Sequence, residues 1–372
     1  MAQTNSRVAI IGGGLSGLHA GSLLASRGVS CALYEGRPRL GGRALSAMQL
    51  GGDVPTSAAA FDLGPAWFWP AAQPRIARLV RDLGLVAFPQ YATGAMRVER
   101  FRLETAQSFI PAVEASPDTM RIRGGVQSLV AALGQTLPPG AIHLSSRVTH
   151  VRRVASVTRG AESAIALTFS DGQTTTADAV VLALPPRLIA RRITFDPPLP
   201  EAMHREMVAT PTWMAPHAKL LAIYDEPFWR SDGLSGMASS SLGPMQEIHD
   251  ASPESGYGAL VGFVGISPLA REKIGEANIR DGVVAQLVRL FGARARTPIA
   301  VHYKDWALDT DTTTSDELED AVLPHGPGTP LLDDGEWGGR LLFAGAEVSD
   351  AHPGYMEGAL LAAERAVGRL AL

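Results

Sequence analysis

The chain has 372 residues, of which 46% are apolar and 19% are charged, and its formal net charge is −4. This composition is typical of a globular protein with one large or two ordinary domains, and it excludes a disordered chain. The near balance of 33 basic and 37 acidic residues gives no electrostatic case for nucleic acid or an anionic membrane as the main partner.

Cys31 is the only cysteine, so an intrachain disulfide and a zinc thiolate cluster are excluded, and we expect a small buried hydrophobe at this position. The nine histidines occur singly, without the spacing of metal ligands, and we predict no metal site. The first strand is expected to begin by Arg7, which leaves no room for a signal peptide, and no apolar run reaches the length of a membrane span. We therefore expect a soluble, cytoplasmic protein.

The N-terminal segment "RVAIIGGGLSGLHAGSLLASRGVSCALYEGRP" predicts a strand, a glycine turn, a helix and a second strand. Residues 8–11 form the continuous apolar run of a parallel strand that is buried on both faces. The helix is expected from about Ser16 to Arg27, with Gly28 as its C-cap, and the second strand is expected to end at Glu35.

The glycine turn has the spacing G-x-G-x-x-G at Gly12, Gly14 and Gly17. In this pattern the first glycine permits a tight turn, the second leaves room for a pyrophosphate, and the third lets the helix and strand pack closely. The helix N-terminus presents unpaired N–H groups to the phosphates, and Glu35 is placed to accept hydrogen bonds from ribose hydroxyls. The segment therefore predicts a dinucleotide site.

A second glycine pair follows in "RPRLGGRALS", where Gly41 and Gly42 precede Arg43. A nicotinamide-binding unit does not need this pair, whereas the pair suits a second loop that folds back over a longer cofactor. Arg43 is then able to reach the pyrophosphate or the flavin, and we include Arg37 among the expected cofactor contacts. The spacing favours FAD over NAD, with an exposed turn as the alternative.

The middle of the chain is expected to supply further strands. "AIHLSSRVTHVRRV" alternates as one strand, and "DAVVLALPP" is a short apolar strand that two prolines end. Between about 186 and 305, "KLLAIY", "GALVGFVG" and "PIAVHY" suit a sheet on the substrate side. Lys219 begins the first of these, with Leu221 and Ile223 on its face of the strand and Leu220, Ala222 and Tyr224 on the other. A lysine on an apolar face is usually paired, or it extends its ammonium to water.

The later acidic run "DTDTTTSDELED" predicts a solvated loop or helix start, because it lacks the spacing of a calcium site.

These motifs together resemble the flavin-containing amine oxidase family, which includes monoamine oxidases, polyamine oxidases and L-amino-acid oxidases. The likeness runs through "VAIIGGGLSGL", "YEGRPRLGGR", "FDLGPAWFWPAAQPRIARLVRDLGL", "ADAVVLALPP", "HAKLLAIYDEPFWR", "KDW" and "FAGAEVSDAHPGYMEGALLAAERA". "GYMEGA" is more similar to monoamine oxidases than to the L-amino-acid branch. The resemblance implies an α/β (α+β overall) fold, in which a Rossmann-like FAD-binding domain is interleaved with a smaller substrate domain on a mixed or antiparallel sheet with helices. The FAD-binding domain would comprise residues 1–85, 122–208 and 309–372, and the substrate domain 86–121 and 209–308.

The resemblance also implies roles for individual residues. The backbone of Val148 would contact the adenine side of FAD, and Lys219 would hold a water near flavin N5. Gly345 and Glu347 would reach the ribityl chain and pyrophosphate, although Glu347 as a solvated turn residue is the alternative. The N–H of Met356, in a helix that begins near Tyr355, would face the flavin O2/N1 edge, where negative charge develops on reduction.

Tyr355 matches one wall of the aromatic cage that flanks the substrate nitrogen in this family. The second aromatic is missing after Trp306, where Asp and Thr stand in its place, and Trp67, Trp69 and Trp213 are the candidates to replace it. The same stretch lacks a cysteine, so we expect FAD to be bound non-covalently and to be released by acid precipitation. The segment that lines the entrance in monoamine oxidases is shortened here, and a second subunit, as in a homodimer, is one way to cover it.

The resemblance implies oxidation of a small-molecule amine. A hydride equivalent passes from the carbon next to nitrogen to flavin N5, the imine hydrolyses, and O₂ reoxidises the flavin to give hydrogen peroxide. In this scheme Lys219 and Tyr355 act at the reacting centre, and Trp213 and Trp67 contact the substrate. The alternatives are an FAD-dependent desaturase of a non-amine apolar or biosynthetic substrate, a flavin with a purely structural role, and a nicotinamide dehydrogenase.

Overall fold

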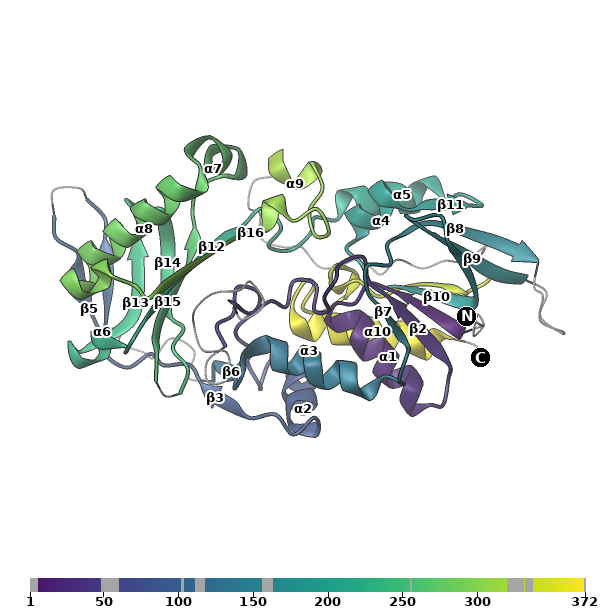
Figure 1. The fold of residues 1–372 in the computed structure, drawn as a ribbon, viewed down its shortest axis with the longest axis horizontal. Helices are drawn as coiled ribbons and strands as arrows, with labels where there is room; N and C mark the ends of the chain where they lie inside the picture. The colour runs from purple at the N-terminus through teal and green to yellow at the C-terminus, as the bar shows by residue number, and fades with distance from the viewer. Residues whose placement is uncertain are drawn as a thin grey trace.

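The computed structural model describes residues 6–47, 60–101, 104–110, 118–155, 163–254, 256–319, 331 and 337–370. Two large β-sheets occupy opposite ends of an elongated molecule, and helices pack on both of them (Figure 1). The first described strand and the last helix belong to the same end, so the chain leaves this half, builds the other and returns. The predicted α/β fold class is confirmed.

The larger sheet has the strand order β11-β8-β9-β10-β1-β2-β7, and β17 also pairs with β10. Its central strand β1 runs parallel to β2 and β10, as the buried apolar run at residues 8–11 predicts. Helices α1, α3 and α10 pack against one face, and α4 and α5 against the other (Figure 1). The strands are β1 (Ser6–Ile11), β2 (Cys31–Tyr34), β7 (Ile142–His143), β8 (Val148–Ala155), β9 (Ser163–Phe169), β10 (Thr174–Leu182), β11 (Thr194–Asp196) and β17 (Leu341–Phe343). The helices are α1 (Leu15–Ser26), α3 (Gly125–Thr136), α4 (Pro186–Arg192), α5 (Glu201–Ala209) and α10 (Met356–Arg369).

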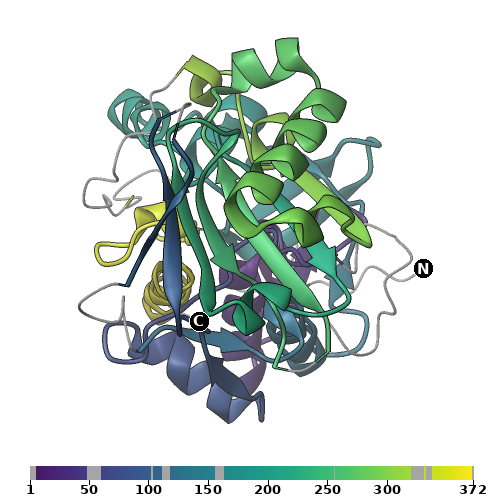
Figure 2. The same cartoon turned by 90° about the vertical axis from the view of Figure 1, so that its left-hand side faces the viewer.

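The second sheet has the order β16-β12-β15-β14-β13-β4-β5 and is antiparallel except for the pair β13 and β4. Helix α8 covers its outer face (Figure 2). The predicted alternation in β12 is confirmed, because Leu220 and Ala222 pack toward α8 whereas Leu221 and Ile223 pack toward Trp306. The strands are β4 (Ala95–Glu99), β5 (Gln107–Phe109), β12 (Ala218–Tyr224), β13 (Leu234–Ser240), β14 (Met245–Asp250), β15 (Gly258–Val264) and β16 (Ala300–Asp305). The helices on this side are α6 (Phe228–Ser231), α7 (Pro268–Ile274) and α8 (Glu276–Phe291).

The remaining described elements are short. They are the paired strands β3 (Ala87–Pro89) and β6 (Met120–Ile122), the helices α2 (Pro74–Asp82) and α9 (Asp316–Glu319), and the 3-10 turns η2 (Ala293–Arg296), η3 (Trp306–Leu308) and η4 (Ala346–Val348). The domain boundaries given above remain a prediction. Of the helices in the described ranges, none combines the length and the apolar character needed to cross a bilayer.

The structure corrects two strand predictions. "AIHLSSRVTHVRRV" forms two strands, β7 and β8, because Ser145 adopts a positive φ of 53° and the chain turns there. The strand that ends at the two prolines is longer than expected, since β10 starts at Thr174. Its first residues pair with β9, and its last residues pair with β1 and β17.

Glu357, in the first turn of α10, has a role that helix-dipole reasoning does not predict. Its carboxylate is buried and accepts hydrogen bonds from the backbone N–H groups of Arg75 (3.1 Å) and Ile76 (2.9 Å). These N–H groups belong to the first turn of α2, which has no capping side chain of its own. Glu357 therefore caps α2 from a distant part of the chain.

We predict that Glu357→Gln lowers the free energy of unfolding by about 1–2 kcal/mol, because a buried N–H loses a charged acceptor. Urea unfolding at saturating flavin measures the change, since ligand binding itself alters apparent stability. The matched control is Glu254→Gln, which removes the exposed pair with Arg123 and is expected to change nothing measurable. Equal effects of the two substitutions would contradict the capping role.

Candidate cofactor and active site

The first glycine turn needs glycine for two separate reasons. Gly12 has a φ of +109°, which other residues rarely adopt. A Cβ on Gly17 would lie 1.9 Å from the carbonyl oxygen of Gly12, so only glycine lets α1 approach the turn this closely. Gly17 therefore acts in packing and does not line the cavity described below.

Gly14 differs, because a Cβ there would meet nothing closer than the carbonyl oxygen of Gly41 at 4.0 Å. Gly14 is the N-cap of α1 and has ordinary backbone angles, so neither strain nor crowding requires a glycine at this position. The space beside it opens into the cavity at a helix N-terminus, where unpaired N–H groups favour an anion. A bound pyrophosphate would account for the missing side chain.

The second glycine loop folds directly onto the first. The N–H of Gly41 donates to the carbonyl of Gly13 at 2.8 Å, and Gly41 and Gly42 both have positive φ angles. A Cβ on Gly42 would lie 3.3 Å from the Cα of Gly14. The two loops therefore form one small-residue floor along the cavity.

The Glu35 carboxylate is buried at one end of this floor, and backbone groups fix its position. Its Oε2 accepts a hydrogen bond from the N–H of Gly13 (2.7 Å), and its Oε1 accepts one from the N–H of Arg37 (2.8 Å). Each oxygen keeps acceptor capacity, so the carboxylate fits ribose hydroxyls. Val148 is not on this cavity but lines a smaller hollow that also touches Glu35 and Arg37.

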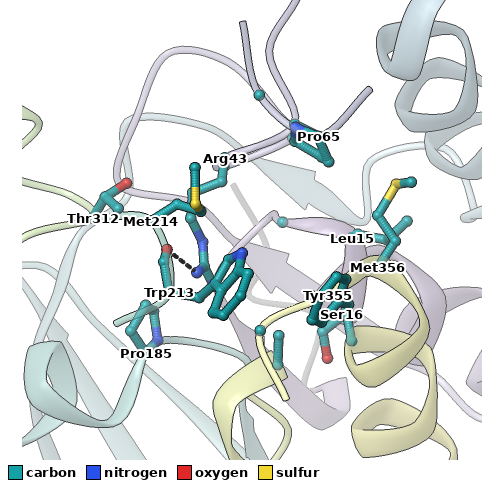
Figure 3. A pocket seen from close by; sticks show the side chains of 18 of the residues that line it. Leu15, Ser16, Arg43, Pro65, Pro185, Trp213, Met214, Thr312, Tyr355 and Met356 are labelled. Carbon is teal, nitrogen blue, oxygen red and sulfur yellow. Dashed lines mark hydrogen bonds between the residues drawn. The ribbon is translucent and has the colours of Figure 1, made fainter. Parts of the chain in front are cut away.

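Arg43 connects the second glycine loop to the C-terminal part of the chain. One guanidinium nitrogen donates to Glu347 Oε1 (2.5 Å) and to the carbonyl of Trp213 (2.9 Å; Figure 3). Only 2% of Glu347 is exposed, which excludes the solvated-turn alternative. Its Oε2 is buried without a hydrogen-bond partner among the described residues. Glu347 lies behind Arg43 and does not itself line the cavity.

Lys219 lies on β12, and 5% of the residue is exposed. Its ammonium donates to the carbonyl of Gly64 at 2.6 Å and lies 4.7 Å from the ring centre of Phe263 and 5.9 Å from that of Trp67. Burial lowers the pKa of Lys219 to about 8, although the charges of Asp62 and Glu247 oppose the shift. The side chain can therefore change its charge near neutral pH.

Tyr355 immediately precedes α10, and its ring contacts that of Trp213 (Figure 3). The ring centres are 4.9 Å apart with an interplanar angle of 38°. A substrate between two facing rings needs a gap of about 7 Å, which is two van der Waals contacts. Trp213 and Tyr355 therefore form one aromatic wall, not the two sides of a cage.

One cavity of about 310 Å³ brings most of the predicted residues together. It runs from the glycine loops and Glu35 to the aromatic wall and Lys219, and so lies between the two sheets. The predicted residues that line it are Gly12, Gly14, Glu35, Arg37, Gly41, Gly42, Arg43, Trp67, Trp213, Lys219, Gly345, Tyr355 and Met356. Trp69, Phe263 and Trp306 add further aromatic surface.

The acidic run after Trp306 is predicted to be a solvated loop or a helix start. A helix, α9, does begin within it at Asp316, but the solvated part of the prediction is wrong for the residues before that helix. Asp309 is largely buried in ion pairs with Arg37 and Lys304, and Asp311 and Thr312 line the cavity. Composition shows that a segment is charged but not which distant cations it meets. The signal available in the sequence was its position, because the run stands where the resemblance expects cage and cofactor residues.

The Rossmann topology, the two glycine loops and the cavity between two sheets define a dinucleotide-binding protein whose second domain completes the site. The open space at Gly14 and the fixed carboxylate of Glu35 fit a dinucleotide cofactor. Within the described ranges, no three His, Cys, Asp or Glu residues form a group that could hold a metal ion.

Comparison with known proteins identifies the family. Residues 89–371 match the model of the flavin containing amine oxidoreductases, and residues 10–83 match that of the NAD(P)-binding Rossmann-like domain. The chain belongs to the flavin-containing amine oxidoreductase family. The resemblance read from the sequence is confirmed, and family membership implies a flavin cofactor.

Among its relatives, an L-amino acid dehydrogenase of Synechocystis is 30% identical over 265 residues, which are 68% of this chain and 51% of the relative. Putrescine oxidase of Kocuria rosea is 30% identical over 195 residues, which are 51% of this chain and 40% of that protein. The chain thus spans about half the length of the curated relatives it matches. A solved structure of putrescine oxidase bound to putrescine has the same fold, with a TM-score of 0.76 at 20% identity and 99% coverage of both chains.

We predict that Gly14→Val folds but is purified without flavin, because a side chain there fills the space for the pyrophosphate. Visible flavin absorbance per mole of protein measures the loss, and far-UV circular dichroism checks the fold. The matched control is Gly368→Val, since a Cβ at Gly368 is likewise uncrowded, with nothing within 4 Å, but Gly368 does not line the cavity. Full flavin content in Gly14→Val would contradict the proposal that the space beside Gly14 holds the pyrophosphate.

Proposed function

We propose that this protein binds FAD non-covalently and oxidises a small-molecule amine, with O₂ as the electron acceptor. The supporting observation is that one cavity extends from the two glycine loops to Lys219 and the aromatic wall of Trp213 and Tyr355. The bound flavin would supply the redox chemistry by accepting a hydride equivalent from the carbon next to nitrogen. No protein nucleophile is needed for this reaction.

The residues at the second-sheet end of the cavity would bind and orient the substrate. Trp213 and Tyr355 offer a continuous aromatic face for the apolar body of an amine and exclude water. Lys219 would position a water, or the amine itself, and would place a positive charge where electrons pass to oxygen. The N-terminus of α10 at Met356 would stabilise negative charge that develops nearby.

The charges along the cavity favour an amine without a carboxylate. A substrate carboxylate is usually bound by an arginine in a two-pronged pair. Among the described lining residues, the arginines are Arg37 and Arg43, and both lie with the glycine loops in ion pairs with Asp309 and Glu347. The aromatic end holds Lys219 as its cation. The Synechocystis relative is named for L-amino acids, and we propose that this chain differs from it in substrate.

Non-covalent attachment is supported by the position of the sole cysteine. Cys31 is buried in β2 and packs within the core of the larger sheet, and it does not line the cavity. Burial also raises the pKa of its thiol, which disfavours the reactive thiolate.

An anaerobic substrate panel tests the proposed function. We expect the flavin of the purified protein to be bleached by hydrophobic monoamines and to yield hydrogen peroxide when air is admitted. The corresponding α-amino acids, which differ by one carboxylate, are expected to bleach it at least about a hundred-fold more slowly, given the cost of an unpaired buried charge. Acid precipitation of the same sample is expected to leave the flavin in solution.

Three outcomes would redirect the assignment. Preferential bleaching by amino acids would contradict the substrate class. Bleaching by an amine without peroxide formation would identify a dehydrogenase that uses another acceptor. Bleaching only by compounds without an amine would support the desaturase alternative.

We predict that Lys219→Met slows reoxidation of the reduced flavin and leaves flavin content unchanged. Lys219 carries its charge below its pKa of about 8 and loses it above, so the wild-type reoxidation rate should fall as pH rises through about 8 or higher. In Lys219→Met the slower rate should be independent of pH over that range. Stopped-flow mixing of reduced protein with O₂ measures both rates, and identical profiles for the two proteins would exclude this role.

A further inference from the structure

A short segment after β16, residues 306–314, crosses from the second sheet to the nucleotide end of the cavity, and we call it the strap. Its first residue, Trp306, is buried and donates from Nε1 to the carbonyl of Leu63 at 3.2 Å. Its turn closes on itself, because the N–H groups of Thr312 and Thr313 donate to the carbonyl of Asp309 at 2.9 and 2.8 Å. The Asp309 carboxylate adds to this turn, because its Oδ1 accepts a hydrogen bond from the N–H of Asp311 at 3.2 Å.

The carboxylate of Asp309 also joins the two halves of the molecule. Its Oδ1 accepts from Arg37 at 2.5 Å, and its Oδ2 accepts from Lys304 at 2.8 Å. Arg37 follows β2 of the larger sheet, whereas Lys304 is on β16 of the second. Burial alone would raise the pKa of Asp309, but the charges and hydrogen bonds of Arg37 and Lys304 outweigh it and lower the pKa to about 2. The Asp309 carboxylate is therefore ionised throughout the neutral pH range in which the protein would be assayed.

Two further contacts hold the strap against the cofactor cavity. Arg37 also donates to Thr312 Oγ1 at 2.9 Å, and Arg147 forms an ion pair with Asp311. Asp311 and Thr312 line the cavity together with Gly12, Gly14 and Glu35. The strap thus forms part of the wall at the nucleotide end of the cavity. Cys31 does not line this cavity, so it offers no covalent attachment for the cofactor there.

Asp309 does not line the cavity, so its influence on the cofactor would be indirect. We propose that Asp309 is a positioning residue that keeps the strap closed over the nucleotide end of the flavin and slows its release. The inference rests on the flavin site of the proposed function but not on the identity of the amine. An ion-paired bridge between the two sheets would then retain the cofactor in place of a covalent bond.

The test is the rate of flavin dissociation from the holoprotein, measured without any amine. Flavin fluorescence rises on release, and an excess of a flavin-binding scavenger protein prevents rebinding. We expect Asp309→Asn to release flavin at least about ten-fold faster, the factor expected when charge-assisted hydrogen bonds are lost. Lys304→Met, which removes one of the two cations and does not touch the cavity, is expected to show a smaller increase.

Two control variants separate this role from general destabilisation. Asp316→Asn removes the more exposed ion pair with Arg191 but keeps a side-chain oxygen that can accept from Thr314 Oγ1, which is 3.3 Å from Asp316 Oδ2, and it should release flavin at the wild-type rate. Glu357→Gln weakens the fold at α2 and should also leave the release rate within two-fold of wild type. If Asp309→Asn does not fold, the Lys304→Met rate decides the question.

Release from Asp309→Asn at the wild-type rate, or equal acceleration in Asp316→Asn, would overturn the proposal. The proposal would also be overturned if the wild-type protein released no flavin under any condition, because the flavin would then be covalently attached. Failure of every amine to reduce the flavin would reject the proposed function and leave the dissociation result valid.

Discussion

The buried ammonium of Lys219 donates to the carbonyl of Gly64, and this hydrogen bond connects the second sheet to the segment that follows the second glycine loop. An ammonium that leaves water must find an acceptor, and here the acceptor belongs to the other half of the molecule. Trp306 makes a parallel contact, since its indole N–H donates to Leu63 in the same short segment. Phe61 and Leu63 of that segment pack with Trp306 against the inner face of the second sheet. The cavity lies beside these contacts, since Gly64, Lys219 and Trp306 all line it.

Three further charges near the cavity follow the same physical rule, because each has an ionic or hydrogen-bonding partner from a distant element. Arg43 meets Glu347, Arg37 meets Asp309, and Glu357 meets the N–H groups of α2. Losing one partner of such a pair leaves an uncompensated buried charge, which costs far more than an exposed pair contributes. The pairs therefore hold the segments that form the cavity walls in one arrangement. The glycine loops complete this arrangement, since their lack of side chains leaves the cavity floor open.

The features predicted correctly from the sequence are those that depend on residues close together in the chain. The strand, glycine turn, helix and carboxylate of the first unit lie within about thirty residues, and each constrains the next through backbone geometry. The contact between Trp213 and Tyr355 joins positions far apart in the chain, so no local pattern indicated it, although Trp213 was a candidate. The helix start in the acidic run was predicted, but the burial of Asp309 was not, because charge alone favours solvent and Arg37 is brought to Asp309 only by the fold. The break between β7 and β8 depends on one residue, Ser145, whose positive φ the alternating pattern conceals.

Lys219 is the lining residue whose charge can change when a charged molecule binds or forms in the cavity. Among the cations on the described lining, Arg37 and Arg43 have carboxylate partners at hydrogen-bond distance. Lys219 has a neutral carbonyl instead, and its nearest opposite charges act only at longer range. Its protonation is therefore the least firmly determined charge in the site, as the lowered pKa reflects. An anion formed beside it would raise this pKa, and the loss of that anion would lower it again. Under the proposed function, negative charge would form and disappear in the cavity, and Lys219, on β12 of the second sheet, is the lining cation whose charge would respond to it.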